Sequence, residues 1–342
     1  MIDLRPYLIG AGLGIFGLSF LPLSGLLPSS AEPGQPAVLD WYFNLAAQQA
    51  ITLRSVMTAV PDLDEPGMVE RGAGHYGLVC ADCHGSPSTP PTQFADNLSP
   101  SPPLLVERMA QWHPDARVFA TVKHGIRRTG MPGWPSQIRD DEVWDIVAFL
   151  KALPDIDAAA YSGMVADDCS GCHGADGEGG VAGVPRLDIQ TPGYLAAALK
   201  AFREGTRESG TMMAAAAQLS DDQIEELAAL YGRGVAAPIG ARPAATAIIV
   251  QYGIPERDVP ACDSCHGANA KPVYPKLDGQ DADYLLSQLE LFKLLEHERG
   301  GANGHIMAEV VRFLESDEMV GLAEWYGAGT VTRAPRELLR HP

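Results

Sequence analysis

One short cysteine motif occurs three times in this chain, and it constrains the fold more than any other feature. All six cysteines of the 342 residues belong to Cys-x-x-Cys-His blocks, which are Cys80/Cys83/His84, Cys169/Cys172/His173 and Cys262/Cys265/His266. The pattern is that of covalent c-type haem attachment. Residues three and four apart share one helical face, so the two thiols can meet the two vinyl groups of one porphyrin while the histidine reaches its iron. The sequence therefore predicts three covalently bound haem c groups.

Other interpretations of paired cysteines fit this spacing less well. A zinc ribbon places its two Cys-x-x-Cys blocks about 15–20 residues apart. Here the blocks recur after 89 residues (Cys80 to Cys169) and 93 residues (Cys169 to Cys262). A thioredoxin-like dithiol needs no adjacent histidine, and three in one chain would be unusual.

Net charge and chain length limit the possible partners and the number of domains. The chain has 43 acidic and 25 basic residues and a formal net charge of −18, which argues against a nucleic-acid partner. Its length suits two or three domains of about 100 residues each. Three haem blocks agree with that count.

The N-terminal stretch 7–28 contains no charged residue, which is enough for a helix of about 20 residues to cross a bilayer. Arg5 precedes it and Glu32 follows it, so the positive-inside rule places the N terminus in the cytoplasm. We expect a single-pass inner-membrane protein whose haem domains face the periplasm. A cleavable export signal that ends near Ala31 is the alternative.

The second and third haem blocks are each followed by the same series of residues. Each block precedes a Pro-x-Leu, a Tyr seven residues after that Leu, a Phe, and a Met with a Leu seven residues later; the pairs are Pro185/Pro275, Leu187/Leu277, Tyr194/Tyr284, Phe202/Phe292, Met212/Met307 and Leu219/Leu314. These regions are therefore duplicated units. The stretch 294–304 is longer than its counterpart in the other unit.

A six-coordinate haem needs a second axial ligand, and a thioether in that position raises the reduction potential relative to a second histidine. The candidates are Met131, Met212 and Met307. Ordinary core packing is the commoner role of a methionine. Met213, His305 and His124 are the nearby alternatives for the three irons.

These residues, over 61–330, resemble the class I c-type cytochromes. The duplicated units resemble the two halves of the dihaem cytochromes c of bacterial periplasms. The first haem region, with Lys123-His124-Gly125 and Gly130-Met131-Pro132, resembles single-haem membrane-anchored cytochromes c. The resemblance implies His/Met ligation and a proline carbonyl beside each histidine ring, with Pro102, Pro185 and Pro275 as the matching prolines.

The resemblance also implies an all-α fold of three tandem class I cytochrome c domains behind one N-terminal transmembrane helix. Within region one, Val143, Ile146, Val147 and Leu150 recur at helical spacing and predict a closing helix over 140–153. The expected organisation is an anchor or uncleaved signal (1–31), a helical spacer (32–60), region one (61–155), region two (156–243), region three (244–332) and a tail (333–342).

An iron with two protein ligands has no vacant site for oxygen or peroxide, so we expect an electron carrier and not an enzyme. The expected donor is a cytochrome bc complex or a dehydrogenase, and the expected acceptor is a haem–copper terminal oxidase. The alternative is the cytochrome subunit of a membrane-bound dehydrogenase, of the alcohol dehydrogenase type, that passes electrons to quinone. A haem enzyme such as a peroxidase would need one open iron.

Three basic residues stand just before Met131 on this acidic chain: Lys123, Arg127 and Arg128. They predict a basic rim that steers an acidic redox partner. The alternative is a solvated loop whose charges only aid solubility.

Overall fold

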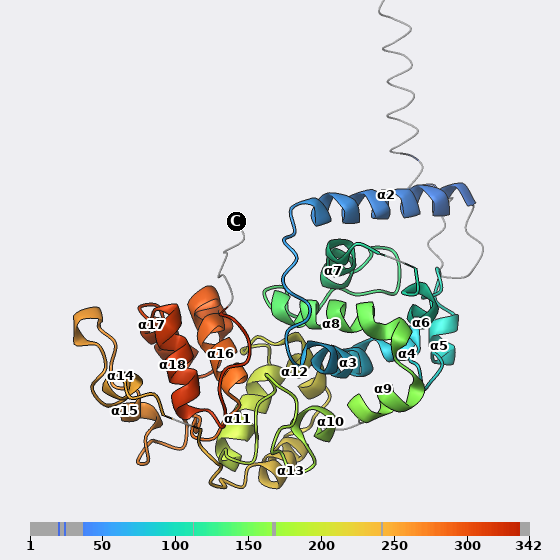
Figure 1. The fold of residues 1–342 in the computed structure, drawn as a ribbon. Helices are drawn as coiled ribbons and strands as arrows, with labels where there is room; N and C mark the ends of the chain where they lie inside the picture. Colours follow the sequence, from blue (N-terminus) through green and yellow to red (C-terminus); the bar gives the residue numbers. More distant parts are fainter. Residues whose placement is uncertain are drawn as a thin grey trace, which may run out of the picture.

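The computed structural model describes residues 37–335 apart from 112, 166–168 and 241, together with Phe20 and Ser24. Within that part of the chain the regular structure is helical, and extended pairing is limited to isolated bridges such as the one between Arg207 and Gly300. The helices form three groups that follow the chain order (Figure 1). The prediction of an all-α fold is confirmed.

The predicted membrane segment lies outside the described residues, except for Phe20 and Ser24. Among the residues described, no helix combines the length and the apolar character needed to cross a bilayer. Helix α2 (Ala37–Val56) falls within the predicted spacer. It lies against α7 (Asp115–His124), where the Arg117 guanidinium donates to Gln48 Oε1 at 2.6 Å.

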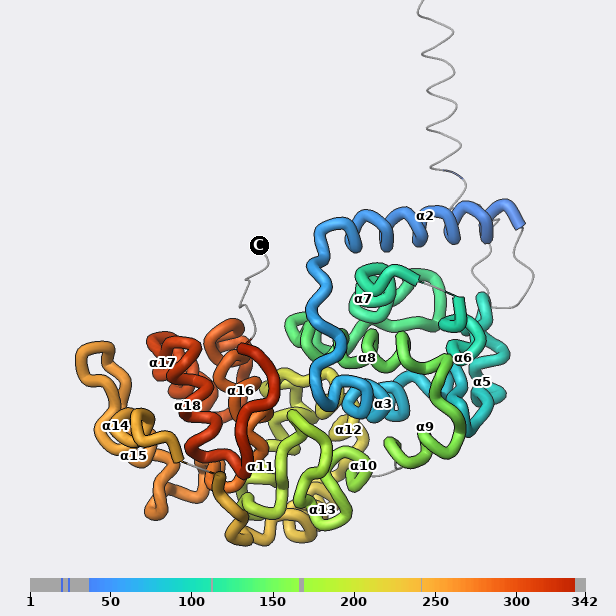
Figure 2. Tube along the Cα trace, in the orientation of Figure 1, coloured from blue at the N-terminus to red at the C-terminus, as the bar shows by residue number. Residues whose placement is uncertain are grey.

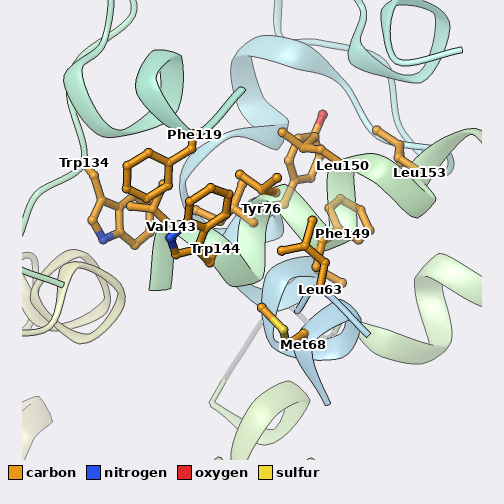
Figure 3. Close-up of a cluster of buried hydrophobic side chains, with 14 of the residues drawn as sticks. Leu63, Met68, Tyr76, Phe119, Trp134, Val143, Trp144, Phe149, Leu150 and Leu153 are labelled. Atoms are coloured by element: carbon orange, nitrogen blue, oxygen red, sulfur yellow. The ribbon is translucent and has the colours of Figure 1, made fainter. Parts of the chain in front are cut away.

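Region one is built on two crossing helices, α3 (Met68–Val79) and α8 (Asp140–Ala152). They approach closely because position 72 is glycine: a Cβ on Gly72 would lie 2.0 Å from the Asp145 carbonyl oxygen. Around the crossing, Tyr76 and Phe149 are fully buried with ring centroids 5.1 Å apart (Figure 3). The shorter helices of this region are α4 (Ala81–His84), α5 (Gln93–Asp96), α6 (Leu105–Arg108) and η1 (Leu153–Asp155).

Region two contains α9 (Ala158–Met164), α10 (Ser170–His173), α11 (Pro192–Arg203), α12 (Gly210–Ala216) and α13 (Asp221–Tyr231). Hydroxyl side chains cap three of these helices: Thr191, Ser209 and Ser220 each accept a backbone N–H of the first turn. Helix α9 packs away from the rest of the region. Its Tyr161 belongs to the region-one core and meets the Tyr76 ring edge-on.

Region three contains α14 (Thr246–Tyr252), η2 (Pro255–Arg257), α15 (Asp263–His266), α16 (Ala282–Leu295), η3 (Glu296–Arg299), α17 (Gly304–Val311) and α18 (Ser316–Tyr326). Its core forms where α14 and α16 meet α18, around Val250, Leu286 and Met319. Figure 2 shows region two lying between the other two regions. Region two therefore has two junctions, one with each neighbour.

Candidate functional site

Each Cys-x-x-Cys-His block folds as one short helical turn. The first cysteine of each block, Cys80, Cys169 or Cys262, is the N-cap residue, and the histidine is the last helical residue. These turns are α4, α10 and α15. The local structure thus places both cysteines and the histidine within a single turn, as the predicted attachment requires.

The three block histidines share one hydrogen bond. In each, the ring Nδ1 lies 2.9–3.0 Å from a proline carbonyl oxygen, and the pairs are His84–Pro103, His173–Pro185 and His266–Pro275. A carbonyl can only accept, so Nδ1 carries the proton and donates it. The lone pair is then on Nε2, which is the arrangement that a metal-ligating histidine has when its other nitrogen is held by a carbonyl.

The prolines follow the family pattern with one correction. The carbonyls of Pro185 and Pro275 accept from the histidines as the resemblance implied. In region one the acceptor is Pro103 and not Pro102. Here 19 residues separate the histidine from its proline, compared with 12 and 9 in the other regions, and adjacent prolines offer two carbonyls one residue apart.

Burial also keeps two of these histidines, His173 and His266, in the form that binds iron. Desolvation lowers the pKa of His173 and of His266, although the proline hydrogen bonds act in the opposite direction. A neutral imidazole is the ligating form. Both rings are therefore neutral and oriented before any metal is considered.

The cysteines do not have the properties of a redox-active dithiol. All six thiols are free. Burial is the main cause that raises the pKa of Cys80 to about 12 and of Cys262 to about 11, and it also raises the pKa of Cys172. Reactive thiols of the thioredoxin type have a lowered pKa. The paired sulfurs thus fit covalent attachment of a prosthetic group better than disulfide exchange.

The motif does not distinguish the two cysteines of a block, whereas the structure does in regions one and three. Cys80 and Cys262 pack against the buried cores of their regions. The second cysteines, Cys83 and Cys265, are half-buried and lie outside those clusters of described residues. Haem attachment through both cysteines of each block stays a prediction.

The methionines predicted as distal ligands are all half-buried. Met307 packs against the region-three core, whereas His305 is exposed beside Pro260 on the outer side of α17. In region one, Met131 is half-buried and His124 is exposed at the end of α7. Burial favours the methionine over the histidine in both places, and the ligand assignments stay predictions.

Met212 lies in the first turn of α12, where its backbone N–H donates to the Ser209 hydroxyl at 3.2 Å. The neighbouring Met213 directs its methyl carbon towards Gly205, whose Cβ position would be 3.9 Å away. The choice between Met212 and Met213 is thus not decided by burial. Met212 remains the predicted ligand.

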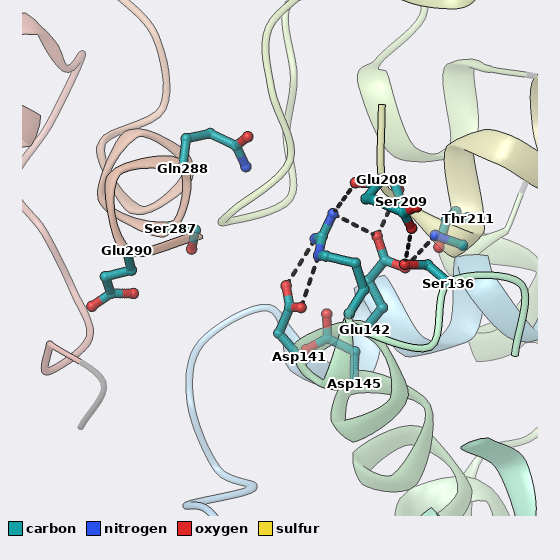
Figure 4. Close-up of polar contacts among 12 residues, drawn as sticks. Ser136, Asp141, Glu142, Asp145, Glu208, Ser209, Thr211, Ser287, Gln288 and Glu290 are labelled. Atoms are coloured by element: carbon teal, nitrogen blue, oxygen red, sulfur yellow. Dashed lines mark hydrogen bonds and ion pairs between the residues drawn. The ribbon is translucent and has the colours of Figure 1, made fainter. Parts of the chain in front are cut away.

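Sequence reasoning missed a buried polar junction between regions one and two (Figure 4). Glu142 on α8 is 4% exposed and accepts from Ser209 Oγ at 2.6 Å, Gly210 N at 2.7 Å and Trp134 Nε1 at 3.0 Å. Arg139 lies 3.1 Å from the same carboxylate. Because Ser209 caps the helix of Met212, a region-one carboxylate helps to fix the predicted distal ligand of region two. The acidic start of 140–153 indicates a helix N terminus and gives no sign of this partner.

Regions two and three meet through a reciprocal pair of amides. The Gln190 side chain bonds the backbone N–H and carbonyl of Lys276 at 3.0 and 2.8 Å. Gln280 does the same with Arg186, at 2.7 and 3.0 Å. Each glutamine stands five residues after the proline that holds the histidine, so an alignment of the duplicated units could have found this local two-fold relation.

The predicted basic rim is mostly engaged within the protein. Lys123 forms an ion pair with Asp140, and Arg128 stacks over the Phe43 ring with 4.2 Å between guanidinium and centroid. Arg127 is exposed. The rim therefore offers less free positive charge than its sequence indicates.

Comparison with known proteins agrees with this geometry. A family model described as "Cytochrome C oxidase, cbb3-type, subunit III" matches residues 67–150, and one described as "Cytochrome c" matches residues 162–230. A thiosulfate dehydrogenase electron acceptor from Stutzerimonas stutzeri (strain A1501) is 34% identical over 168 residues, which cover 46% of this chain and 77% of that protein.

Two further relatives have other names. Cytochrome c4 from Thiocapsa roseopersicina is 33% identical over 133 residues, which cover 36% of this chain and 69% of that protein. The cbb3-type cytochrome c oxidase subunit FixP from Sinorhizobium medicae (strain WSM419) is 24% identical over 245 residues, which cover 65% and 77% respectively. All three names belong to proteins of electron transfer.

Proposed function

The chain belongs to the multihaem class I c-type cytochromes, which are electron carriers, and we propose that it holds three haem c groups and relays single electrons between redox proteins. The observation that carries this proposal is the shared hydrogen bond of the three block histidines. It presents an unprotonated Nε2 in each region. A bound haem supplies a one-electron couple there, and the residues of the chain orient its ligand and keep water away.

The proposed direction runs from a dehydrogenase, or a cytochrome bc complex, to a haem–copper terminal oxidase. Similarity to a protein named as the electron acceptor of a dehydrogenase supports the donor. The match of region one to an oxidase subunit model, and the similarity to FixP, support the acceptor. Region one is then the exit towards the oxidase.

We further propose that the protein is anchored in the inner membrane with its haem regions in the periplasm. The uncharged stretch 7–28 supports the anchor. Helix α2 follows that stretch and exposes Trp41, Tyr42 and Leu53, side chains suited to a membrane interface. Extraction of membranes with alkaline carbonate tests this proposal: the full chain should stay in the pellet, and its release into the supernatant would refute the anchor.

The test of the electron-carrier proposal has two parts. Denatured protein freed of loose haem by acid–acetone should have the mass of the polypeptide plus three haem c groups, and fewer additions would refute the three-haem assignment. The ferrous protein should bind little carbon monoxide, because sulfur closes each distal position. Avid binding at one haem would instead indicate an enzyme with an open iron.

A further inference from the structure

Arg299 is buried at the junction of regions two and three without a counter-charge. It is 2% exposed, at the end of η3. Its Nη2 donates to Gln288 Oε1, whereas Nε and Nη1 have no hydrogen-bond partner among the described residues. The longer stretch of region three, 294–304, therefore delivers a guanidinium with two unused donors into the interior.

A second arginine comes to the same place from region two. The backbones of Arg207 and Gly300 form an antiparallel bridge, and Glu208 N donates to Arg299 O at 3.2 Å. The Arg207 guanidinium lies 3.4 Å from the hydroxyls of both Tyr194 and Tyr284. These tyrosines occupy equivalent positions in the duplicated units, so the arginines sit on the local two-fold junction.

The other buried arginines of the described chain have carboxylate partners. Arg71 pairs with Asp145 at 2.7 Å, Arg139 with Asp141 at 2.8 Å, and Arg333 with Glu290 at 2.6 Å. Among the described residues, no salt bridge joins Arg207 or Arg299 to a carboxylate. Burying a charge without a partner of opposite charge is energetically unfavourable. The junction thus has the electrostatics of a site built for an anion.

The charge on Arg299 persists at neutral pH. Burial, together with repulsion from Arg207 and Arg139, lowers its pKa to about 9. An arginine in this state gains from a carboxylate, which its planar fork binds through two parallel hydrogen bonds. Arg207 lies five residues before Met212, and Arg299 eight before Met307, so both precede the predicted distal ligands.

We propose that Arg207 and Arg299 bind the propionate carboxylates of the haems attached in regions two and three, an inference that rests on the proposed function. The pair supplies the positive charge, and Tyr194 and Tyr284 supply hydroxyl donors from each unit. A guanidinium beside a haem favours reduction, because the added electron is attracted to it. The junction therefore raises the reduction potentials of both haems.

Spectroelectrochemistry of the holoprotein tests the proposal with R299Q, R207Q and R312Q. Arg312 is an exposed residue of region three and supplies the charge-matched control. R299Q and R207Q should shift the midpoint potentials of the second and third haems downward relative to R312Q, with the first haem unchanged. The carboxylate bands in redox-difference infrared spectra should shift in the same two variants. R299K, which keeps the charge but loses the fork, should give a smaller shift and guards against a variant that does not fold.

Potentials and carboxylate bands equal to those of R312Q would overturn the proposal. A free anion is the other possible source of the charge, and inorganic phosphate is its probe. Phosphate should neither bind wild-type holoprotein at this junction nor change its potentials; phosphate binding that R299Q abolishes would overturn the propionate assignment. The haem content distinguishes failure of the proposed function from failure of this inference. A mass that corresponds to fewer than three haems would refute the proposed function. Three haems whose midpoint potentials do not shift in R299Q and R207Q would refute only the propionate assignment.

Discussion

The two junctions of region two bury charge in opposite ways. Towards region one, Glu142 and Arg139 lie within 3.1 Å of each other, and Arg71 and Asp145 form a second pair at 2.7 Å. Towards region three, the Gln190 and Gln280 amides bond the opposite backbone, and Asp281 Oδ1 accepts from Gly183 N at 3.0 Å. The buried Arg299 has no carboxylate partner among the described residues. The first junction pairs its buried charges with protein groups alone, whereas the second leaves Arg299 without a carboxylate among the described residues, and there we propose haem propionates as its partners.

The difference suggests that the first junction depends on protein side chains and the second on the cofactor. A protein-only junction should depend on its own residues for stability whatever the haem content. A junction that needs an anion should report on the haems through their potentials. Predictions that alter single residues at each junction can therefore support or break the contrast.

The largest effect is expected from Glu142→Ala. The substitution leaves Arg139, Ser209 Oγ, Gly210 N and Trp134 Nε1 without their shared acceptor. Removing one member of a buried ion pair costs about 3–5 kcal/mol. Denaturant unfolding of the holoprotein should show this loss, and Glu226→Ala, on the exposed face of α13, should show almost none. Equal stabilities of the two variants would mean that the region-one junction is not held by charge.

Gln190→Ala and Gln280→Ala should each have a smaller and similar effect. Each removes two hydrogen bonds to the opposite backbone, so each should cost about 1–3 kcal/mol. The two glutamines share no partner, and the double variant should equal the sum within about 0.5 kcal/mol.

Gln218→Ala, at an exposed position of region two, is the control for helix and loop effects. Unequal losses from the two glutamine variants would break the local two-fold relation. Unfolding monitored through the haem absorbance provides the measurement.

The predicted haem sites could be read from the sequence because each depends on residues that are close together in the chain. One helical turn determines each Cys-x-x-Cys-His block, and the spacing of Val143, Ile146 and Leu150 predicted the helix that the structure has as α8 (Asp140–Ala152). The structure ends this α-helix one residue earlier than predicted and continues in η1. The roles of Pro185 and Pro275 beside the histidine rings followed from the resemblance to class I c-type cytochromes, and the structure confirms both contacts.

The junctions were not predictable in the same way. Glu142 and Ser209 are 67 residues apart, and no periodicity links them. Gly210 shows the same limit: a Cβ there would lie 2.2 Å from Trp134 Nε1, so the glycine is required by a residue of another region. The sequence predicted Pro102 as the acceptor, but the structure has Pro103. Only the path of the intervening chain decides which of the two carbonyls reaches His84. Contacts of this kind depend on the packing of regions.

A pH effect of about 1 kcal/mol should appear at the region-one junction. His75 is buried against Thr211, with 2.9 Å between Nδ1 and Oγ1. Burial lowers its pKa; Asp145 and Glu142 oppose that shift, and Arg71 and Arg139 add to it.

The unfolded chain takes up a proton near the ordinary histidine pKa of about 6.5, whereas the folded chain resists it, so stability falls as pH drops below that value. Between pH 7.5 and 5.5, His75→Gln should lose about 1 kcal/mol less stability than wild type. The exposed His297→Gln is the control. If the free energy of unfolding of His75→Gln depended on pH as that of wild type does, His75 would not be the group that makes this junction sensitive to acid.

The smallest effect on stability, and the only one on salt dependence, is expected at the outer surface of region one. Replacing Lys123, Arg127 and Arg128 with Gln removes the Lys123–Asp140 ion pair. Apart from the loss of that pair, the free energy of unfolding should stay within about 0.5 kcal/mol of the wild-type value. Electron delivery to an acidic partner should slow a few-fold at low salt and not at high salt, because exposed charges are screened. Arg127→Gln alone should account for most of that change, since Arg128 is stacked on Phe43. If the rate of electron delivery depended on salt in the triple variant as it does in wild type, the basic rim would be refuted. The buried charges at the two junctions would then be the only charged groups to which we assign a function.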